Sequence, residues 1–135
     1  MSAYAERLSV RSSKREQAID VTERVRDAVK KSHVRRGVCV VYAQHTTAGL
    51  FVNENADPAV LADLFAALRR AVPDDASYRH AEGNAPAHIR TVMTGASASV
   101  PIEDGDLALG RWQGVFLVDF DGPRERQFLV TVIGD

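Results

Sequence analysis

The stretch that decides the fold is Val38-Cys39-Val40-Val41-Tyr42-Ala43, which runs directly into Gln44-His45-Thr46-Thr47. Its apolar residues occupy both alternating faces, so it predicts a central β-strand that is covered on both sides. Alternation also places His45 on the same face as Cys39 and Val41. An imidazole at the end of an apolar face needs hydrogen-bond partners. The run therefore predicts a core strand with a partly buried histidine at its end.

The segments around this strand predict a mixture of strands and helices. A second apolar run, 49–52, predicts the strand that follows His45. An amphipathic helix is predicted from Thr22 to before Gly37, and another begins at Pro58, with Asp57 as its N-cap, and ends before Pro73. Short alternating or apolar runs bounded by turn residues predict further strands at 5–10, 17–20, 97–102, 112–120 and 126–133.

Residues 74–90 contain Gly83 and Pro86 and show too little periodicity for a helix or a strand, so they predict a long loop. Long loops in compact domains are more often functional than idle. No repeat or change of composition divides the chain. We therefore expect one α+β domain over residues 1–135, with two main helices and mostly antiparallel strands.

The composition excludes several classes of protein. The formal net charge is -1, from 17 Lys and Arg against 18 Asp and Glu, so no overall field attracts nucleic acid or an anionic membrane. Cys39 is the only cysteine and lies in an apolar run, which excludes an internal disulfide. The first residues do not resemble a signal peptide, and no apolar stretch is long enough to cross a bilayer. We expect a cytoplasmic protein.

Three of the four histidines, His45, His80 and His88, lie at a strand end or in the predicted loop. Imidazole is the commonest metal ligand and titrates near neutral pH, so a shared metal or acid–base site is one interpretation. The alternative is three separate histidines, each hydrogen-bonded where it lies. Because the spacing matches no zinc motif such as HExxH, the residues alone favour this alternative.

Two acidic residues are candidate catalytic groups. Glu54 lies between a predicted strand and a predicted helix and, unlike Asp57, has no capping role. Asp119 lies on an apolar strand face, so it is either exposed or a buried acid with a partner, for which a histidine is suitable. Side chains suited to binding phosphate or orienting a substrate are those of Thr46, Thr47, Asn53, Arg90 and Arg124. Arg126 also carries a guanidinium group and could bind phosphate in the same way.

Five segments together resemble the YjbQ-like family in order and spacing, and the resemblance covers nearly the whole chain. It implies an α+β fold with a β-sandwich and assembly as a homotrimer. It also implies that His45, His80 and His88 cluster near a subunit boundary. The segments are His45-Thr46-Thr47-Ala48-Gly49, Asn53-Glu54-Asn55-Ala56-Asp57-Pro58, Tyr78-Arg79-His80, Ala87-His88-Ile89 and Gly110-Arg111-Trp112-Gln113-Gly114.

Members of this family are identified as secondary thiamine-phosphate synthases, which implies a transferase of thiamine biosynthesis. Such an enzyme joins a pyrimidine diphosphate to a thiazole phosphate and releases pyrophosphate. From the resemblance we expect His45, His80 and His88 to hold a divalent metal such as zinc, with Glu54 or Asp119 as outer or acid–base groups. The family more often carries glutamate where this chain has Asp119. The alternative is a non-catalytic ligand-binding or assembly protein whose histidines stabilise a trimer.

Overall fold

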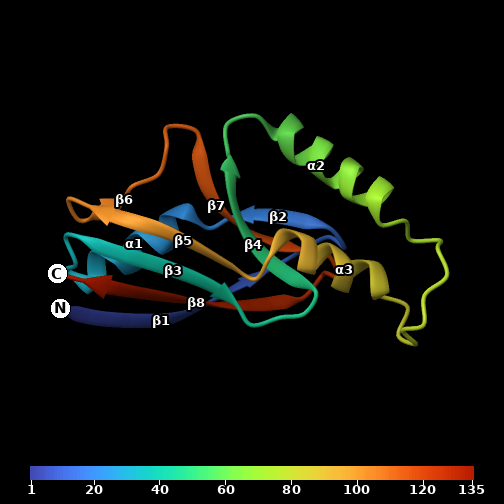
Figure 1. The fold of residues 1–135 in the computed structure, drawn as a ribbon, viewed down its shortest axis with the longest axis horizontal. Coiled ribbons are helices and arrows are strands. Elements are labelled where there is room, and N and C mark those ends of the chain that lie inside the picture. Colours follow the sequence, from blue (N-terminus) through green and yellow to red (C-terminus); the bar gives the residue numbers. More distant parts are fainter.

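The computed structural model describes all residues 1–135, which form two antiparallel β-sheets and three helices (Figure 1). The five-stranded sheet has the order β1-β8-β3-β5-β6, and the three-stranded sheet has the order β2-β7-β4. The α+β class and the antiparallel pairing are as predicted. The elements are β1 (Ser2–Arg11), β2 (Gln17–Asp20), α1 (Thr22–Ser32), β3 (Gly37–Ala43), β4 (Ala48–Glu54), α2 (Pro58–Ala71), α3 (Ala85–Thr94), β5 (Ser97–Glu103), β6 (Asp106–Leu107), β7 (Gln113–Asp119) and β8 (Glu125–Gly134).

The main core lies between the two sheets and α1. Every second residue of β3 and β8 points into it, including the fully buried Val41 and Val130. The spacing of apolar residues in α1 places Val25 and Val29 on one buried face. Lys30 and Lys31 lie in its last turn, where their positive charges interact favourably with the negative end of the helix dipole. This packing holds the end of β3, and therefore His45, in a fixed position.

A smaller apolar cluster joins α2 and α3 to the three-stranded sheet. It contains the buried side chains of Leu68, Ala87, Val118 and Phe120. The side chain of Asp57 accepts a hydrogen bond from the N–H of Ala59 (2.9 Å), so the predicted N-cap of α2 is confirmed. No helix of the chain combines the length and the apolar character needed to span a bilayer.

The prediction of a loop through residue 90 was wrong, because a third helix, α3, begins at Ala85. Pro86 lies in its first turn, where a proline has no hydrogen bond to lose. Residues at intervals of three and four in this helix are apolar but exposed: Ile89 at 40%, Val92 at 82% and Met93 at 54%. The face that α3 buries is made of small and polar residues, including Ala87, Arg90 and Thr91, so it gave no apolar helical pattern.

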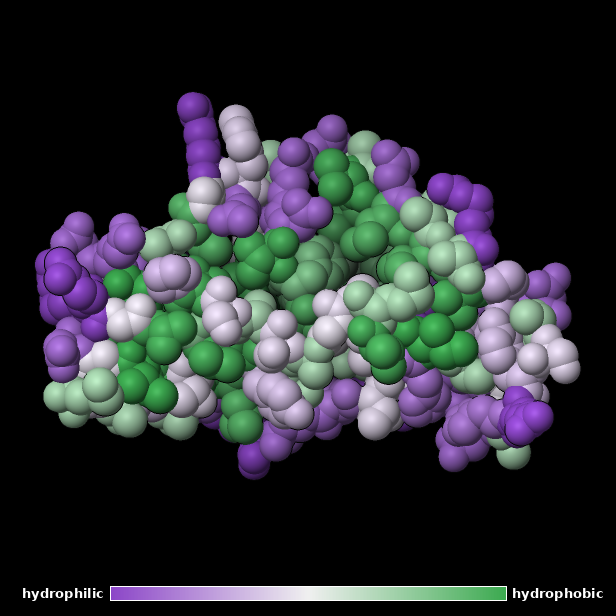
Figure 2. Space-filling view, viewed as in Figure 1, coloured by the Kyte–Doolittle hydropathy of each residue, from purple (hydrophilic) through white to green (hydrophobic).

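The prediction that β3 is covered on both sides was also wrong for the single chain. Its outward face is open, since Val38 is 36% exposed and Tyr42 is 47% exposed. Ile133 of the neighbouring strand β8 pairs with Val38 and is 37% exposed. Figure 2 shows apolar side chains across this face, over β3 and β8. We call this the open sheet face.

Candidate functional site

A buried ion pair lies beside His45 and joins two strands that follow one another in the sequence and belong to different sheets. Asp119 ends β7 and Arg126 is near the start of β8, and their side chains are 0% and 4% exposed. Arg126 donates from Nη2 to Oδ1 of Asp119 (2.7 Å) and from Nε to Oδ2 (2.9 Å). Asp119 also accepts from the hydroxyl of Ser12 (2.6 Å) and from the N–H of Asp121 (2.9 Å).

These contacts keep Asp119 ionised despite its burial. Burial alone would raise the pKa of Asp119, but the hydrogen bonds from Arg126, Ser12 and Asp121 outweigh it, so the pKa lies below its ordinary value. Asp119 is thus the buried acid with a partner that the sequence allowed. Its partner is an arginine and not a histidine, because β8 returns beside β7's end with Arg126 pointing inward.

The backbone of Gln127, burial and the charge of Arg126 together determine the state of His45. The backbone N–H of Gln127 donates to Nε2 of His45 (2.8 Å), and Nη1 of Arg126 lies 3.5 Å from Nδ1. A backbone amide can only donate, so Nε2 is unprotonated and the hydrogen of the neutral ring is on Nδ1. Burial, and then the charge of Arg126, lower the pKa of His45 below 6.5. At neutral pH His45 is therefore an uncharged hydrogen-bond donor.

His45 opens into a cavity of about 430 Å³ that has no acidic residue in its wall. The hydroxyl of Thr47 accepts from Nη2 of Arg126 (2.9 Å), which leaves its own hydrogen free to donate. Arg124 is exposed and pairs with Asp121 at 3.1 Å. We call this space the His45 cavity, and its wall consists of Tyr42, Ala43, Gln44, His45, Thr46, Thr47, Ala96, Arg124 and Arg126.

The other two predicted metal ligands lie together but apart from His45. The rings of His80 and His88 meet edge to face, with centroids 4.9 Å apart. No three His, Cys, Asp or Glu side chains of the chain are placed to hold a metal ion together. Nε2 of His45 is already engaged by Gln127, and a nitrogen that accepts a hydrogen bond has no lone pair left for a metal. The residues of one chain therefore do not fit the expected metal.

Three further predicted residues lie outside the His45 cavity. Glu54 and Asn53 are at the opposite end of β4 from His45, and Glu54 accepts from the N–H of Asp57 (3.2 Å). Arg90 is 2% exposed and donates to the carbonyl of Val72 (2.6 Å) and to the carboxylates of Asp74 and Glu16. Its guanidinium ties α3 to neighbouring segments of the fold and does not face the His45 cavity.

Sequence reasoning missed two contributors to the site, and grouped a third, Arg126, only with the general phosphate-binding candidates. Gln127 acts through its backbone N–H, which no residue type reveals. Ser12 lies 107 residues from Asp119 in the sequence, so only the folded chain brings them together. The alternation of buried residues in the last strand could have indicated that Arg126 points inward with Phe128 and Val130.

The sequence profile of the family described as UPF0047 protein YjbQ-like matches residues 6–135. The chain belongs to the YjbQ-like family. A UPF0047 protein of Methanocaldococcus jannaschii is 44% identical over 126 residues, which are 93% of this chain and 91% of that protein. The UPF0047 protein YugU of Bacillus subtilis is 38% identical over 128 residues, which are 94% and 97% of the two chains.

Solved structures of YjbQ-like proteins share the same fold. An uncharacterised conserved protein of Clostridium acetobutylicum superposes with a TM-score of 0.93 at 44% identity, over 95% of this chain and 99% of that one. A protein of unknown function from Sulfolobus solfataricus gives a TM-score of 0.95 at 30% identity, over 98% of both chains. The likeness extends over nearly the whole chain, so the YjbQ-like fold includes both sheets and all three helices.

Proposed function

We propose that this chain is an enzyme that acts on a small phosphorylated or heterocyclic molecule and binds its anionic group in the His45 cavity. The observation that carries the proposal is the hydrogen bond from the backbone of Gln127 to Nε2 of His45, at 2.8 Å. It directs the Nδ1 hydrogen away from Gln127, on the side of the ring nearest to Nη1 of Arg126. An imidazole donor beside a guanidinium, in a wall without carboxylates, suits a phosphate group.

Each polar group of the cavity has a distinct role in this proposal. Arg126 is a positioning residue for Thr47, to which it donates (2.9 Å), and Asp119 holds its guanidinium in place through two hydrogen bonds. His45 and Thr47 donate to the bound anion, and Arg124, whose side chain is exposed and paired with Asp121, supplies a guanidinium at the rim. Donors that are already oriented before the substrate arrives stabilise developing negative charge with little reorganisation.

The transferase reaction implied by the resemblance is compatible with this set of groups. Joining a pyrimidine diphosphate to a thiazole phosphate requires stabilisation of the negative charge on the departing pyrophosphate. The cavity offers guanidinium, imidazole and hydroxyl donors for that charge. Thiamine-phosphate synthesis is therefore included in the proposal as an activity of this site, and not as its established purpose.

We further propose that copies of the chain meet at α3 and the open sheet face, in a homotrimer. Support comes from the exposed apolar residues Ile89, Val92 and Met93, which surround the half-buried His88 on α3. Contiguous apolar surface of this kind marks interaction sites more often than it faces water. A divalent metal such as zinc, held by His80 and His88 with a group of another copy, belongs to the same proposal.

The anion site is tested by thermal melting with inorganic phosphate and pyrophosphate. A ligand that binds only the folded state raises the melting temperature by mass action. We expect pyrophosphate to stabilise the wild type and the His33→Gln control equally, and to bind His45→Gln about tenfold more weakly, as the loss of a hydrogen bond to a charged group predicts. Equal stabilisation of all three proteins, or of none, would contradict the proposal.

The metal is tested separately on protein purified without an affinity tag. Metal content at a stoichiometric level in the wild type, and its loss after joint substitution of His80 and His88 by alanine, supports the shared metal. Equal, negligible metal in both proteins removes it without affecting the anion site.

A second candidate function is a non-catalytic assembly or ligand-binding protein, which the open sheet face also favours. The two functions differ in their response to thiamine precursors. An enzyme of the proposed kind turns over a pyrimidine diphosphate and a thiazole phosphate with release of pyrophosphate, and this activity disappears in His45→Gln. A purely structural protein shows no turnover, and substitution of His80 or His88 alters its oligomeric state.

A further inference from the structure

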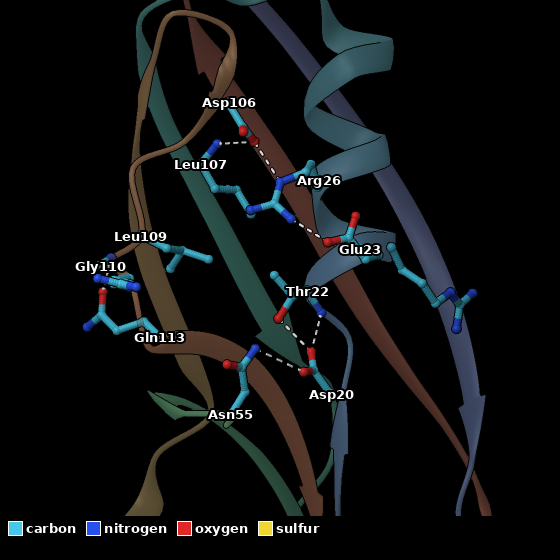
Figure 3. A pocket seen from close by; sticks show the side chains of 12 residues that line it. Asp20, Thr22, Glu23, Arg26, Asn55, Asp106, Leu107, Leu109, Gly110 and Gln113 are labelled. Atoms are coloured by element: carbon cyan, nitrogen blue, oxygen red, sulfur yellow. Dashed lines mark hydrogen bonds and ion pairs between the residues drawn. The ribbon is translucent and has the colours of Figure 1, made fainter. Parts of the chain in front are cut away.

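Two of the arginines that line cavities of the chain are held in different ways. In a cavity of about 500 Å³ beside α1, Arg26 donates to Asp106 (2.8 Å) and to Glu23, so two carboxylates hold its guanidinium (Figure 3). Arg124, in the wall of the His45 cavity, has a single carboxylate partner, Asp121, at 3.1 Å. The side chain of Arg124 is also 55% exposed, against 24% for Arg26. Arg124 is therefore the guanidinium that a ligand can draw away from its partner.

The partner, Asp121, lies in the turn between β7 and β8 and is held there without the help of Arg124. Its Oδ2 accepts from Nδ2 of Asn84 (2.9 Å), and its backbone N–H donates to Oδ1 of Asp119 (2.9 Å). The same Oδ2 atom accepts from Nη2 of Arg124. Because two other residues hold Asp121, its carboxylate stays in place when Arg124 leaves it.

Asn84 gives up a local role to make its contact with Asp121. It is the N-cap residue of α3, but its side chain makes no capping hydrogen bond, although asparagine is among the preferred N-cap residues. Its Nδ2 donates to Asp121 instead, and its Oδ1 is buried without a partner. A buried carbonyl oxygen without a donor costs stability. Departures of this kind from local preference are expected at functional positions, so the contact with Asp121 is a candidate functional contact.

The guanidinium of Arg124 can reach the His45 cavity by movement of its side chain alone. The main chain of Arg124 is fixed by Ser12, whose hydroxyl accepts from the N–H of Arg124 (2.9 Å) and whose own N–H donates to its carbonyl (2.9 Å). Burial is the largest cause of the lowered pKa of His45, and the charges of Arg126 and Arg124 lower it further. The charge of Arg124 therefore already acts on the imidazole while its guanidinium is paired with Asp121.

We propose that Asp121 competes with the bound anion for Arg124 and so sets how tightly the His45 cavity holds that anion. This inference rests on the anion site of the proposed function. Before an anion binds, Asp121 positions the guanidinium of Arg124 at the rim. The anion then draws the guanidinium inward, because a phosphate group, with a charge of about −1.5 to −2, attracts it more strongly than one carboxylate does. Asp121 stays in the turn on its other two hydrogen bonds and takes Arg124 back when the anion leaves.

Asp121→Asn tests the competition in a calorimetric titration with pyrophosphate. The variant keeps the N–H that Asp119 accepts and an oxygen for Nδ2 of Asn84, but it loses the charge that holds Arg124. We expect pyrophosphate to bind about fivefold more tightly, the upper end for an exposed ion pair, because Asp121 itself is only 19% exposed. The control Asp63→Asn, which removes a charge from an exposed position of α2, leaves the affinity unchanged.

The Arg124→Gln background separates competition from simple repulsion between Asp121 and the anion. When Arg124 is absent there is nothing to compete for, so adding Asp121→Asn to Arg124→Gln is expected to change the affinity by less than about twofold. A fivefold gain in this background as well would mean that Asp121 only repels the anion, and would overturn the inference. Equal affinity of Asp121→Asn and the wild type would overturn it too.

The wild type itself provides a second measurement, which needs no altered Asp121. The Nε–H signal of Arg124 in proton–nitrogen NMR spectra, identified by its absence from Arg124→Gln, is expected to shift as pyrophosphate saturates the protein. A signal that stays in place would show that the guanidinium keeps its partner. Binding that depends on His45, without a gain in Asp121→Asn, removes this inference alone, whereas no binding to either protein removes the proposed function with it.

Discussion

Replacing Arg126 by methionine leaves the carboxylate of Asp119 buried without its cation. Breaking a buried ion pair on one side costs about 3–5 kcal/mol. Asp119 is 0% exposed, but it keeps the hydroxyl of Ser12 at 2.6 Å and the N–H of Asp121 at 2.9 Å. Because these two donors still solvate the charge, we expect the lower part of the range, a loss of about 3 kcal/mol in the free energy of unfolding.

Urea denaturation followed by circular dichroism measures this loss, at pH 7 and one fixed protein concentration. With a urea dependence of about 1–3 kcal/mol per molar, the midpoint moves down by about 1–3 M. Arg124→Met is the matched control. Its partner Asp121 lies 3.1 Å away, but Arg124 is 55% exposed, so removing this surface pair changes stability by less than about 1 kcal/mol. Similar losses in both variants would refute the reasoning.

The low pKa of Asp119 adds a pH dependence to the same experiment. The contribution of a carboxylate with a depressed pKa is present above its unfolded pKa and is lost as the pH falls through the folded value. The difference between wild type and Arg126→Met is therefore expected to shrink in acid. A difference that is constant from pH 7 to pH 3 would mean that the ion pair is not its source.

Three further outcomes are expected. Gly49→Ala places a Cβ against the carbonyl of Gly95, which accepts from the N–H of Leu50 at 3.0 Å. We expect the free energy of unfolding in urea to fall by about 1–3 kcal/mol, and an unchanged urea midpoint would contradict the close approach of Gly49 to Gly95. Because the pKa of His45 is below 6.5, the unfolded chain binds the proton first as the pH falls. The melting temperature of the wild type is therefore expected to fall between pH 7 and pH 5 more steeply than that of His45→Gln, and an equal fall in both proteins would disprove this. For Val38→Lys, which puts a charge on the open sheet face, we expect analytical ultracentrifugation to give the mass of one chain instead of that of the proposed trimer. A trimer that stays intact would show that the contact between chains lies on another surface.

The sequence predicted the parts of the fold that depend on local patterning. The apolar run 38–43, the run 126–133 and the capped start at Pro58 are properties of neighbouring residues, and these elements were predicted to within a few residues. α3 was missed because Pro86 resembled a breaker and because the face that it buries consists of small and polar residues, among them Arg90 and Thr91. A helix is predicted from its sequence when large apolar residues recur on the face that packs, and the packing face of α3 lacks them.

The candidate site was predictable in its residue types and not in its pairings. His45 and Thr47 follow the central strand, so their place at its end was inferred correctly. The pairing of Asp119 with Arg126 depends on how β7 and β8 meet across a turn, which the sequence does not encode locally. That His45 meets His80 and His88 stays a prediction, and it concerns contacts between copies of the chain.

The amide that holds His45 belongs to β8, the strand that pairs with both β1 and β3 in the middle of the larger sheet. A slip of β8 by one residue would turn Val130 and Val132 outward and at the same time withdraw the N–H of Gln127 from the imidazole. Correct ring orientation is thus inseparable from correct strand alignment. A misaligned chain cannot keep a working site, so occupancy of that site by a ligand is a direct measure of how many molecules have reached the native arrangement.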